Sequence, residues 1–182
     1  MIVRWGIQRA GLAISAASIC LALMCGATLV PVTLSVGTRA KPGQALAIVV
    51  NHANPVDNLS SRELRKLFLG ERNHWPNGRR VAVAMLDYGR PERQTVLRLI
   101  YRMDENGYQD HLLEGMFSGN VFVAPKTLSS PEILRKFVFN APGAIGYLRA
   151  SDVDDSVKVL RIDGLLPDDK DYRLQIDEPA VK

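Results

Sequence analysis

The residues best placed to do chemistry in this sequence lie near the predicted starts of helices and ends of strands. They supply an amide, two hydroxyls, a glycine and two guanidinium groups, and they are Asn51, Ser60, Ser61, Gly89, Arg90 and Arg93. The free N–H groups of a helix N-terminus carry about half a positive charge, so these positions attract anions. Arginine adds bidentate hydrogen bonds to an oxyanion. The set therefore predicts a site for a small oxyanion.

These residues form one site only if the fold brings their segments together. Asn51 ends a predicted strand, the segment 87–93 follows another strand, and Ser129–Ser130 precedes a helix. In α/β proteins, ligands bind at the carboxyl ends of the strands. We expect the three segments to meet there with Ser60–Ser61.

The same segments also allow a purely structural interpretation. Asp87 and Glu92 would repel an anion unless each is paired. Arg93 could pair with a neighbouring acid while Glu92 complements the helix dipole. Ser60 and Ser61 could act as helix caps alone. The residues by themselves leave both interpretations open.

An alternation of strands and helices must position these residues. The expected elements are strand 45–51, helix 61–69, strand 80–86, helices 91–102 and 108–117, an edge strand 121–124, helix 130–140, and strands 144–148 and 157–162. This order predicts an α/β fold in which helices flank a sheet.

The stretch from Leu59 to Gly78 is the most distinctive part of the sequence. Ser60 and Glu63 have the spacing of a capping box, and Gly70 predicts the end of the helix. The residues Trp75-Pro76-Asn77-Gly78 then predict a turn that leads into a strand.

The aromatic residues near these motifs are predicted to be structural. We expect Phe68 and Phe117 in the core, and we expect the indole N–H of Trp75 to find a carbonyl oxygen. Gly143 is expected to take a backbone conformation that other residues resist.

The N-terminal segment has the layout of a secretory signal. Arg4 and Arg9 precede an apolar run that ends in small residues near Ala27. The run is also long enough for an uncleaved membrane anchor. The expected organisation is a signal peptide or anchor over 1–27, a linker over 28–44, a domain over 45–163 and a loosely ordered tail over 164–182.

Composition excludes several classes of site. Cys20 and Cys25 both lie in the N-terminal segment, so the exported domain has no disulfide and no cysteine metal site. The net charge of +4 falls to about +2 without Arg4 and Arg9, and no basic block indicates nucleic-acid binding. The three histidines are far apart in sequence, which predicts no metal site. No catalytic motif is present, so we expect neither an enzyme nor a cofactor.

Three motifs occur in an order typical of one family. They are Ser60 to Gly70 followed by Trp75 to Gly78, Met116 to Gly119, and Ala141 to Tyr147. In these motifs the chain resembles the phosphate-type periplasmic substrate-binding proteins of ABC transporters, which have the type II periplasmic-binding fold. The resemblance implies a single lobe of that fold, with a mixed sheet flanked by helices. It also implies a periplasmic location and binding of phosphate or another small oxyanion for an ABC transporter.

The chain departs from the family pattern at one place. The full-length family has an arginine and a Ser-Gly-Thr run after the strand that matches Val81 to Leu86. Here the hydroxyl donors are missing, and Arg90 comes later than the family's arginine. The resemblance therefore implies the fold more strongly than the phosphate site.

A single lobe supplies only one wall of a cleft, whereas ligand pockets usually enclose most of a small ligand. Tight capture would need a homodimer, a partner lobe or a transporter permease, and we expect weak or no binding by the monomer. The alternative is a non-catalytic envelope module for protein interaction that kept the fold and lost the ligand. Membrane contact is expected only through the N-terminal segment, as an inner-membrane anchor if it stays uncleaved.

Overall fold

The computed structural model describes residues 44–117 and 124–176. Its elements are β1 (Leu46–Val50), β2 (Asn58–Leu59), α1 (Ser61–Phe68), β3 (Ala82–Leu86), α2 (Pro91–Val96), the π-helix η1 (Leu97–Tyr101), α3 (Glu105–Phe117), β4 (Lys126–Leu128), α4 (Pro131–Asn140), β5 (Ala144–Arg149), the short 3₁₀ helix η2 (Ala150–Asp152), β6 (Lys158–Val159) and β7 (Arg161–Ile162). Within these ranges, no helix has the length and apolarity needed to cross a membrane.

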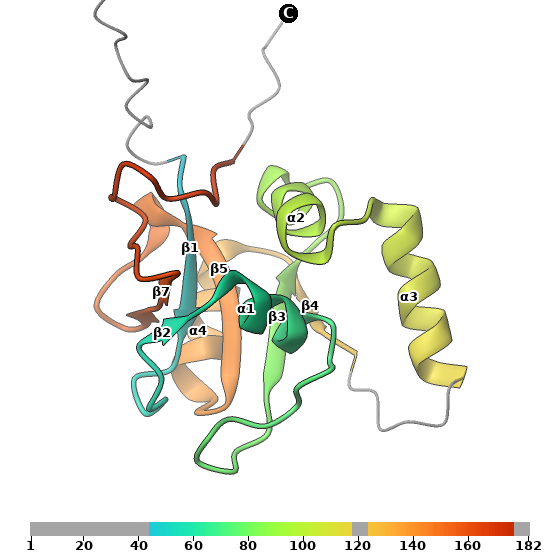
Figure 1. Cartoon of the computed structure of the whole chain (residues 1–182), viewed down its shortest axis with the longest axis horizontal. Helices are drawn as coiled ribbons and strands as arrows, with labels where there is room; N and C mark the ends of the chain where they lie inside the picture. The colour runs from blue at the N-terminus through green and yellow to red at the C-terminus, as the bar shows by residue number, and fades with distance from the viewer. Residues whose placement is uncertain (1–43, 118–123, 177–182) are drawn as a thin grey trace, which may run out of the picture. The chain divides into compact units, whose positions relative to one another are not determined.

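A mixed five-stranded sheet with the order β4-β3-β5-β1-β6 forms the centre of the domain (Figure 1). β3 runs parallel to β4 and β5, whereas β1 runs antiparallel to β5 and β6. β2 and β7 form a separate parallel pair. The α/β class with a mixed sheet and flanking helices is thus confirmed.

Helices cover both faces of this sheet. Neighbouring residues of a strand point to opposite sides, so they show which helix covers which face. A Cβ built on Gly146 would lie near the side chains of Leu134 and Ala84, so these residues mark the face under α4. Met85 contacts the hydroxyl of Tyr101 in η1 and marks the other face. In Figure 1, α4 accordingly lies behind the sheet and α1 in front of it.

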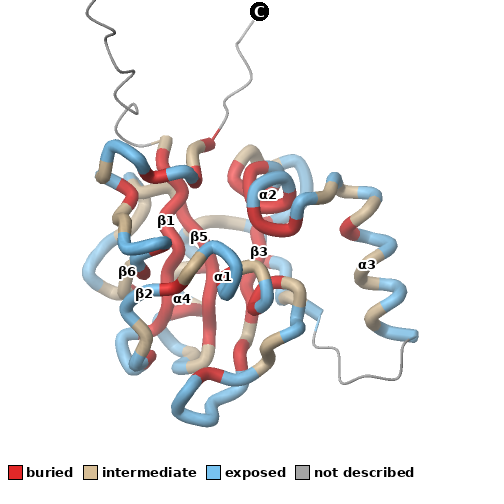
Figure 2. The backbone as a smooth tube through the Cα atoms, in the orientation of Figure 1, coloured by how far each residue is buried: buried red, intermediate tan, exposed pale blue. Residues whose placement is uncertain are grey.

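The buried strand predicted at 45–51 is confirmed as an interior strand of the sheet. All five residues of β1 are fully buried, and the central strands form the buried body of the domain in Figure 2. A continuous apolar run of this kind suits a strand that is covered on both faces. The core therefore lies on both sides of β1 and β5.

The capped helix and the tryptophan turn also form as predicted. Ser60 and Glu63 make the capping box of α1, and Phe68 is buried at its end. Trp75 is buried, and its Nε1–H donates to the carbonyl of Gly143 at 2.9 Å. Local capping and turn chemistry therefore decide this part of the fold.

Gly143 is required for a reason other than the predicted one. Its φ is not positive. Instead, a Cβ at this position would lie 2.1 Å from the carbonyl oxygen of Arg80. Close approach of two backbones, rather than an unusual conformation, explains the glycine.

The helix predicted at 91–102 is present but not uniform. α2 continues into the π-helix η1, which ends at Arg102 in the left-handed conformation, with φ 60°. Val96, Leu97, Ile100 and Tyr101 are buried, as their helical spacing predicts. Single π-turns inside helices occur often at functional sites.

The prediction that Phe117 fills the core is wrong. Its side chain is 84% exposed at the end of α3, and Tyr108 is the one buried residue of that helix. Figure 2 shows α3 as a largely exposed helix. Phe117 therefore lies beyond the part of α3 that packs on the domain through Tyr108.

The edge strand predicted at 121–124 falls almost entirely outside the described residues. In the described part, the strand at the edge of the sheet beside β3 is β4, which comes after Pro125 rather than before it. The strand predicted at 157–162 divides into β6 and β7, which pair with different partners.

The prediction of a loosely ordered tail over 164–182 is wrong for residues 164–176. Tyr172, Leu174 and Ile176 are buried at alternate positions. The Leu46 N–H donates to the Leu174 carbonyl at 2.8 Å, and the Tyr172 hydroxyl donates to the Leu46 carbonyl at 2.7 Å. The period-two apolar pattern lets this segment pair with the start of β1, so the packed domain extends to Ile176.

Candidate functional site

Two of the predicted segments meet at the edge where β3 and β4 end. Leu86 and Leu128 are register partners in these parallel strands, and the N–H of Asp87 donates to the Leu128 carbonyl at 3.0 Å. Arg90 reaches across and donates from Nη2 to the Ser129 carbonyl at 2.8 Å. The segments 87–93 and 129–130 therefore lie side by side, as the sequence predicts.

The starts of two helices converge at this edge. α2 begins at Pro91 after Arg90, which makes no side-chain cap, and α4 begins at Pro131, where Ser130 accepts the N–H of Ile133 at 3.2 Å. Gly89 lies two residues before the start of α2 and has a φ of 82°, a conformation that favours glycine. Both helix dipoles place positive charge at the same edge.

Asn51 does not join this edge. β1 runs antiparallel to β5, so the carboxyl end of β1 lies at the opposite end of the sheet from the end of β3. Asn51 is buried there, and its amide donates to the carbonyls of Val138 and Phe139 at the end of α4. The prediction that Asn51 joins the other segments is wrong, because the carboxyl ends of strands meet at one edge only where the strands are parallel.

Ser60 and Ser61 are bonded to carboxylates of the protein itself. Ser60 accepts the N–H of Glu63 and donates to its carboxylate, while Ser61 donates from both N–H and Oγ to Asp163. The backbone and hydroxyl bonds from Ser60 lower the pKa of Glu63. The hydroxyl and N–H of Ser61 lower the pKa of Asp163. The start of α1 thus already binds two internal anions.

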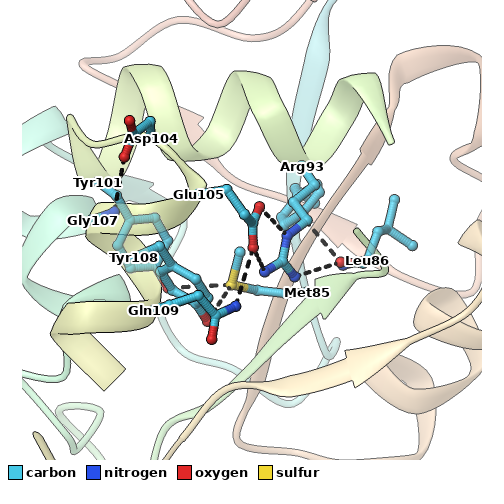
Figure 3. A network of polar contacts seen from close by, with 10 residues as sticks. Met85, Leu86, Arg93, Tyr101, Asp104, Glu105, Gly107, Tyr108 and Gln109 are labelled. Atoms are coloured by element: carbon cyan, nitrogen blue, oxygen red, sulfur yellow. Dashed lines mark hydrogen bonds and ion pairs between the residues drawn. The ribbon is translucent and has the colours of Figure 1, made fainter. Parts of the chain in front are cut away.

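Arg93 is buried in an ion pair rather than exposed to a ligand (Figure 3). Its Nε donates to the Glu105 carboxylate at 3.0 Å, Nη1 donates to the Leu86 carbonyl at 2.9 Å, and the guanidinium lies over the Tyr108 ring at 5.1 Å. Burial opposes the charge, but the hydrogen bonds and charge of Glu105 outweigh it and raise the pKa of Arg93. Here the structural interpretation is confirmed.

The tyrosines around this ion pair are buried with it. The hydroxyls of Tyr101 and Tyr108 both point to the sulfur of Met85, at 3.4 and 3.1 Å. Burial raises the pKa of each phenol, so both stay neutral at physiological pH. This cluster fixes α3 to the sheet through Tyr108 and Met85.

Glu92 forms a second buried pair at the same edge, with Arg149 at the end of β5. One carboxylate oxygen of Glu92 is buried without a hydrogen-bond partner among the described residues. Arg149 was missed by sequence reasoning. The signal available in the sequence was its position directly after the predicted strand 144–148.

A cavity of about 620 Å³ adjoins this edge and was also missed. It lies between the loop after β3, the π-helix and the start of α3. Its lining residues are Tyr88, Gly89, Gln94, Leu97, Arg98, Arg102, Met103, Asp104 and Glu105. Its volume is in the range of small-molecule sites. No cluster of three potential metal ligands occurs in the ranges 44–117 and 124–176.

No family model matches this chain. In sequence, the phosphate-binding protein PstS of Bacillus subtilis is 29% identical over 126 residues, which are 69% of this chain and 38% of that protein. The resemblance to the phosphate-type substrate-binding proteins is thus confirmed, over part of the length of such a protein. The chain spans less than half the length of the relatives that it matches.

Solved structures agree on the fold. An ABC-type phosphate transport receptor from Vibrio cholerae matches with a TM-score of 0.55 and 22% identity, over 68% of this chain and 48% of that one. A substrate-binding protein from Clostridium perfringens with bound phosphate matches with a TM-score of 0.56 and 19% identity, over 68% and 46%. The described domain has the fold of part of such proteins, consistent with a single lobe.

Proposed function

We propose that this chain is a single-lobe solute-binding protein of phosphate transport. Its binding surface is the edge formed by Gly89, Arg90 and Ser129–Ser130, and its ligand is phosphate or another small oxyanion. The observation that carries the proposal is the convergence of the starts of α2 and α4 beside Arg90. The relation to a phosphate-binding protein supports phosphate as the ligand.

The proposed ligand set is smaller than the one predicted from sequence. Arg90 is half-buried, and one of its nitrogens donates to Ser129, which orients the guanidinium at the edge. The predicted residues whose polar groups are bonded within the protein are left out, and they are Asn51, Ser60, Ser61 and Arg93. The two backbone segments and Arg90 would then supply the hydrogen bonds.

This edge is one wall of a site, so we propose that a second surface completes it. The candidates are a transporter permease, a partner lobe or a second copy, in the cell envelope after export. The relatives are named as binding and transport proteins, and we propose no catalytic role.

The test is calorimetry and thermal unfolding of the purified chain with phosphate, sulfate and chloride at equal ionic strength. Phosphate should raise the unfolding temperature at millimolar concentration, because a ligand that binds the folded state stabilises it. Arg90→Gln should weaken binding about tenfold or more, since a charged hydrogen bond contributes roughly 1.5–3 kcal/mol.

Arg79→Gln is the matched control, because Arg79 is exposed in the tryptophan turn. Equal binding by the Arg90 and Arg79 variants would move the site elsewhere. An identical response to all three anions would contradict the proposal and favour the interaction module.

A further inference from the structure

The cavity of about 620 Å³ begins where the proposed oxyanion surface ends. Gly89 belongs to both, and a Cβ built on it would meet no atom within 4 Å, so the space beside this residue is open. Gln94 lines the cavity, and its N–H donates to the carbonyl of Arg90 at 3.0 Å. The cavity therefore starts about one helical turn from Arg90.

Part of the cavity wall is apolar. Leu97 is buried, Met103 is partly buried, and Tyr88 is 77% exposed beside Gly89. Apolar and aromatic side chains are the usual lining of small-molecule sites, which have volumes of about 300–1,000 Å³. A phosphate ion would leave most of this cavity empty, whereas an organic group attached to the phosphate would remove apolar surface from water.

The formal charges of the cavity lining cancel. Two guanidinium groups and two carboxylates contribute to it, from Arg98, Arg102, Asp104 and Glu105. Glu105 is already paired with the buried Arg93, and Asp104 accepts the N–H of Gly107 at 2.8 Å. Because a charge taken out of water needs a partner, this lining suits a neutral group better than a second anion.

We propose that the ligand is a phosphate monoester, whose phosphate binds beside Arg90 and whose neutral organic group occupies this cavity. The inference rests on the proposed function, because it extends the same oxyanion surface. The phosphate accepts hydrogen bonds from Arg90 and from the backbone segments at Gly89 and Ser129–Ser130. The organic group packs against Leu97 and Met103.

The test is calorimetry of the purified chain with phenyl phosphate, inorganic phosphate and phenol at equal ionic strength. Phenyl phosphate should have a dissociation constant about tenfold or more below that of inorganic phosphate, because its ring leaves water for the cavity. Phenol should bind more weakly than phenyl phosphate, since it lacks the oxyanion. Arg90→Gln should weaken binding of phenyl phosphate as it weakens that of inorganic phosphate.

A bulky substitution tests where the organic group binds. Gln94→Trp adds an indole at an exposed position that lines the cavity, so the advantage of phenyl phosphate over inorganic phosphate should be lost. Leu99→Trp is the matched control, because Leu99 is exposed on η1 and is not among the lining residues. This control should keep the advantage, and circular dichroism checks that each variant is folded.

The ligand series separates failure of this inference from failure of the proposed function. If inorganic phosphate binds and phenyl phosphate binds no more tightly, the inference is overturned and the proposed function stands. If neither binds, both are overturned. Equal affinities for phenol and phenyl phosphate would also overturn the inference, as would an equal loss of the advantage in Gln94→Trp and Leu99→Trp.

Discussion

At the residue scale, several groups suited to an anion are bound to carboxylates of the same chain. Ser61 binds Asp163, and Arg93 binds Glu105. An internal carboxylate satisfies the same donors as a free anion without losing translational freedom on binding. Arg90, which donates to a carbonyl instead, is therefore the arginine that remains in the proposed site.

The Ser61–Asp163 contact predicts an acid-sensitive part of stability. Ser61 lowers the pKa of Asp163 in the folded state. Such a group stabilises the fold above its unfolded pKa of about 3.9, and this contribution is lost as pH falls through the lower folded pKa. Ser61→Ala should lower the urea midpoint at neutral pH. When the pH falls below about 4, the midpoint of the variant should decrease less than that of the wild type.

The measurement is the urea midpoint of both proteins as a function of pH. Glu63 keeps its bonds to Ser60 in both, so its contribution cancels in the comparison. Parallel pH profiles for the two proteins would show that the Ser61–Asp163 contact makes no pH-dependent contribution to stability.

At the element scale, α3 is attached through few groups. One anchor is the Arg93–Glu105 ion pair (Figure 3). Another is the buried ring of Tyr108, which packs edge-on against the ring of Tyr101 with the two ring centroids 5.1 Å apart. The helix spacing predicts that α3 exists, but its apolar residues lie on two sides. Sequence periodicity could not reveal which side faces the domain, so Phe117 was misplaced.

Glu105→Gln should loosen α3 before the rest of the domain. Removing one partner of a buried ion pair costs about 3 kcal/mol, because the other charge stays buried without compensation. Hydrogen exchange of residues 105–117 should therefore speed up roughly a hundredfold, while β1 and β5 keep their protection. Glu71→Gln, at an exposed position outside α3, is the control. Uniform acceleration across the sheet would mean that the pair stabilises the whole domain.

At the scale of the whole domain, the C-terminal segment closes the core. Tyr172, Leu174 and Ile176 are buried, although they lie far from β1 in sequence. Each buried side chain of this size contributes about 1.5–3 kcal/mol, and domains have total stabilities of about 5–15 kcal/mol. The segment therefore contributes a large share of the stability.

Deletion of residues 164–182 should abolish the cooperative urea transition and the near-ultraviolet dichroism. Tyr172→Phe removes only the hydroxyl bonded to Leu46 and should cost about 1 kcal/mol. A truncated chain that unfolds cooperatively, with a midpoint near that of Tyr172→Phe, would show that the domain ends near Asp163.

The sequence by itself determined the features that depend on neighbours in the chain. The capping box of Ser60 and Glu63, the buried strand β1 and the turn at Trp75 arise from contacts within a few residues or from an uninterrupted apolar run. Together with the motif order, these features were sufficient for the α/β class and the related family.

Only the tertiary structure decided which residues meet. The antiparallel direction of β1 separates Asn51 from Arg90, and the contact between Ser61 and Asp163 joins positions 102 residues apart. Strand direction and long-range pairing depend on how the whole sheet is assembled. Since a hydrogen-bond donor binds whichever acceptor the fold brings to it, the identity of the bound groups could not be read from local sequence.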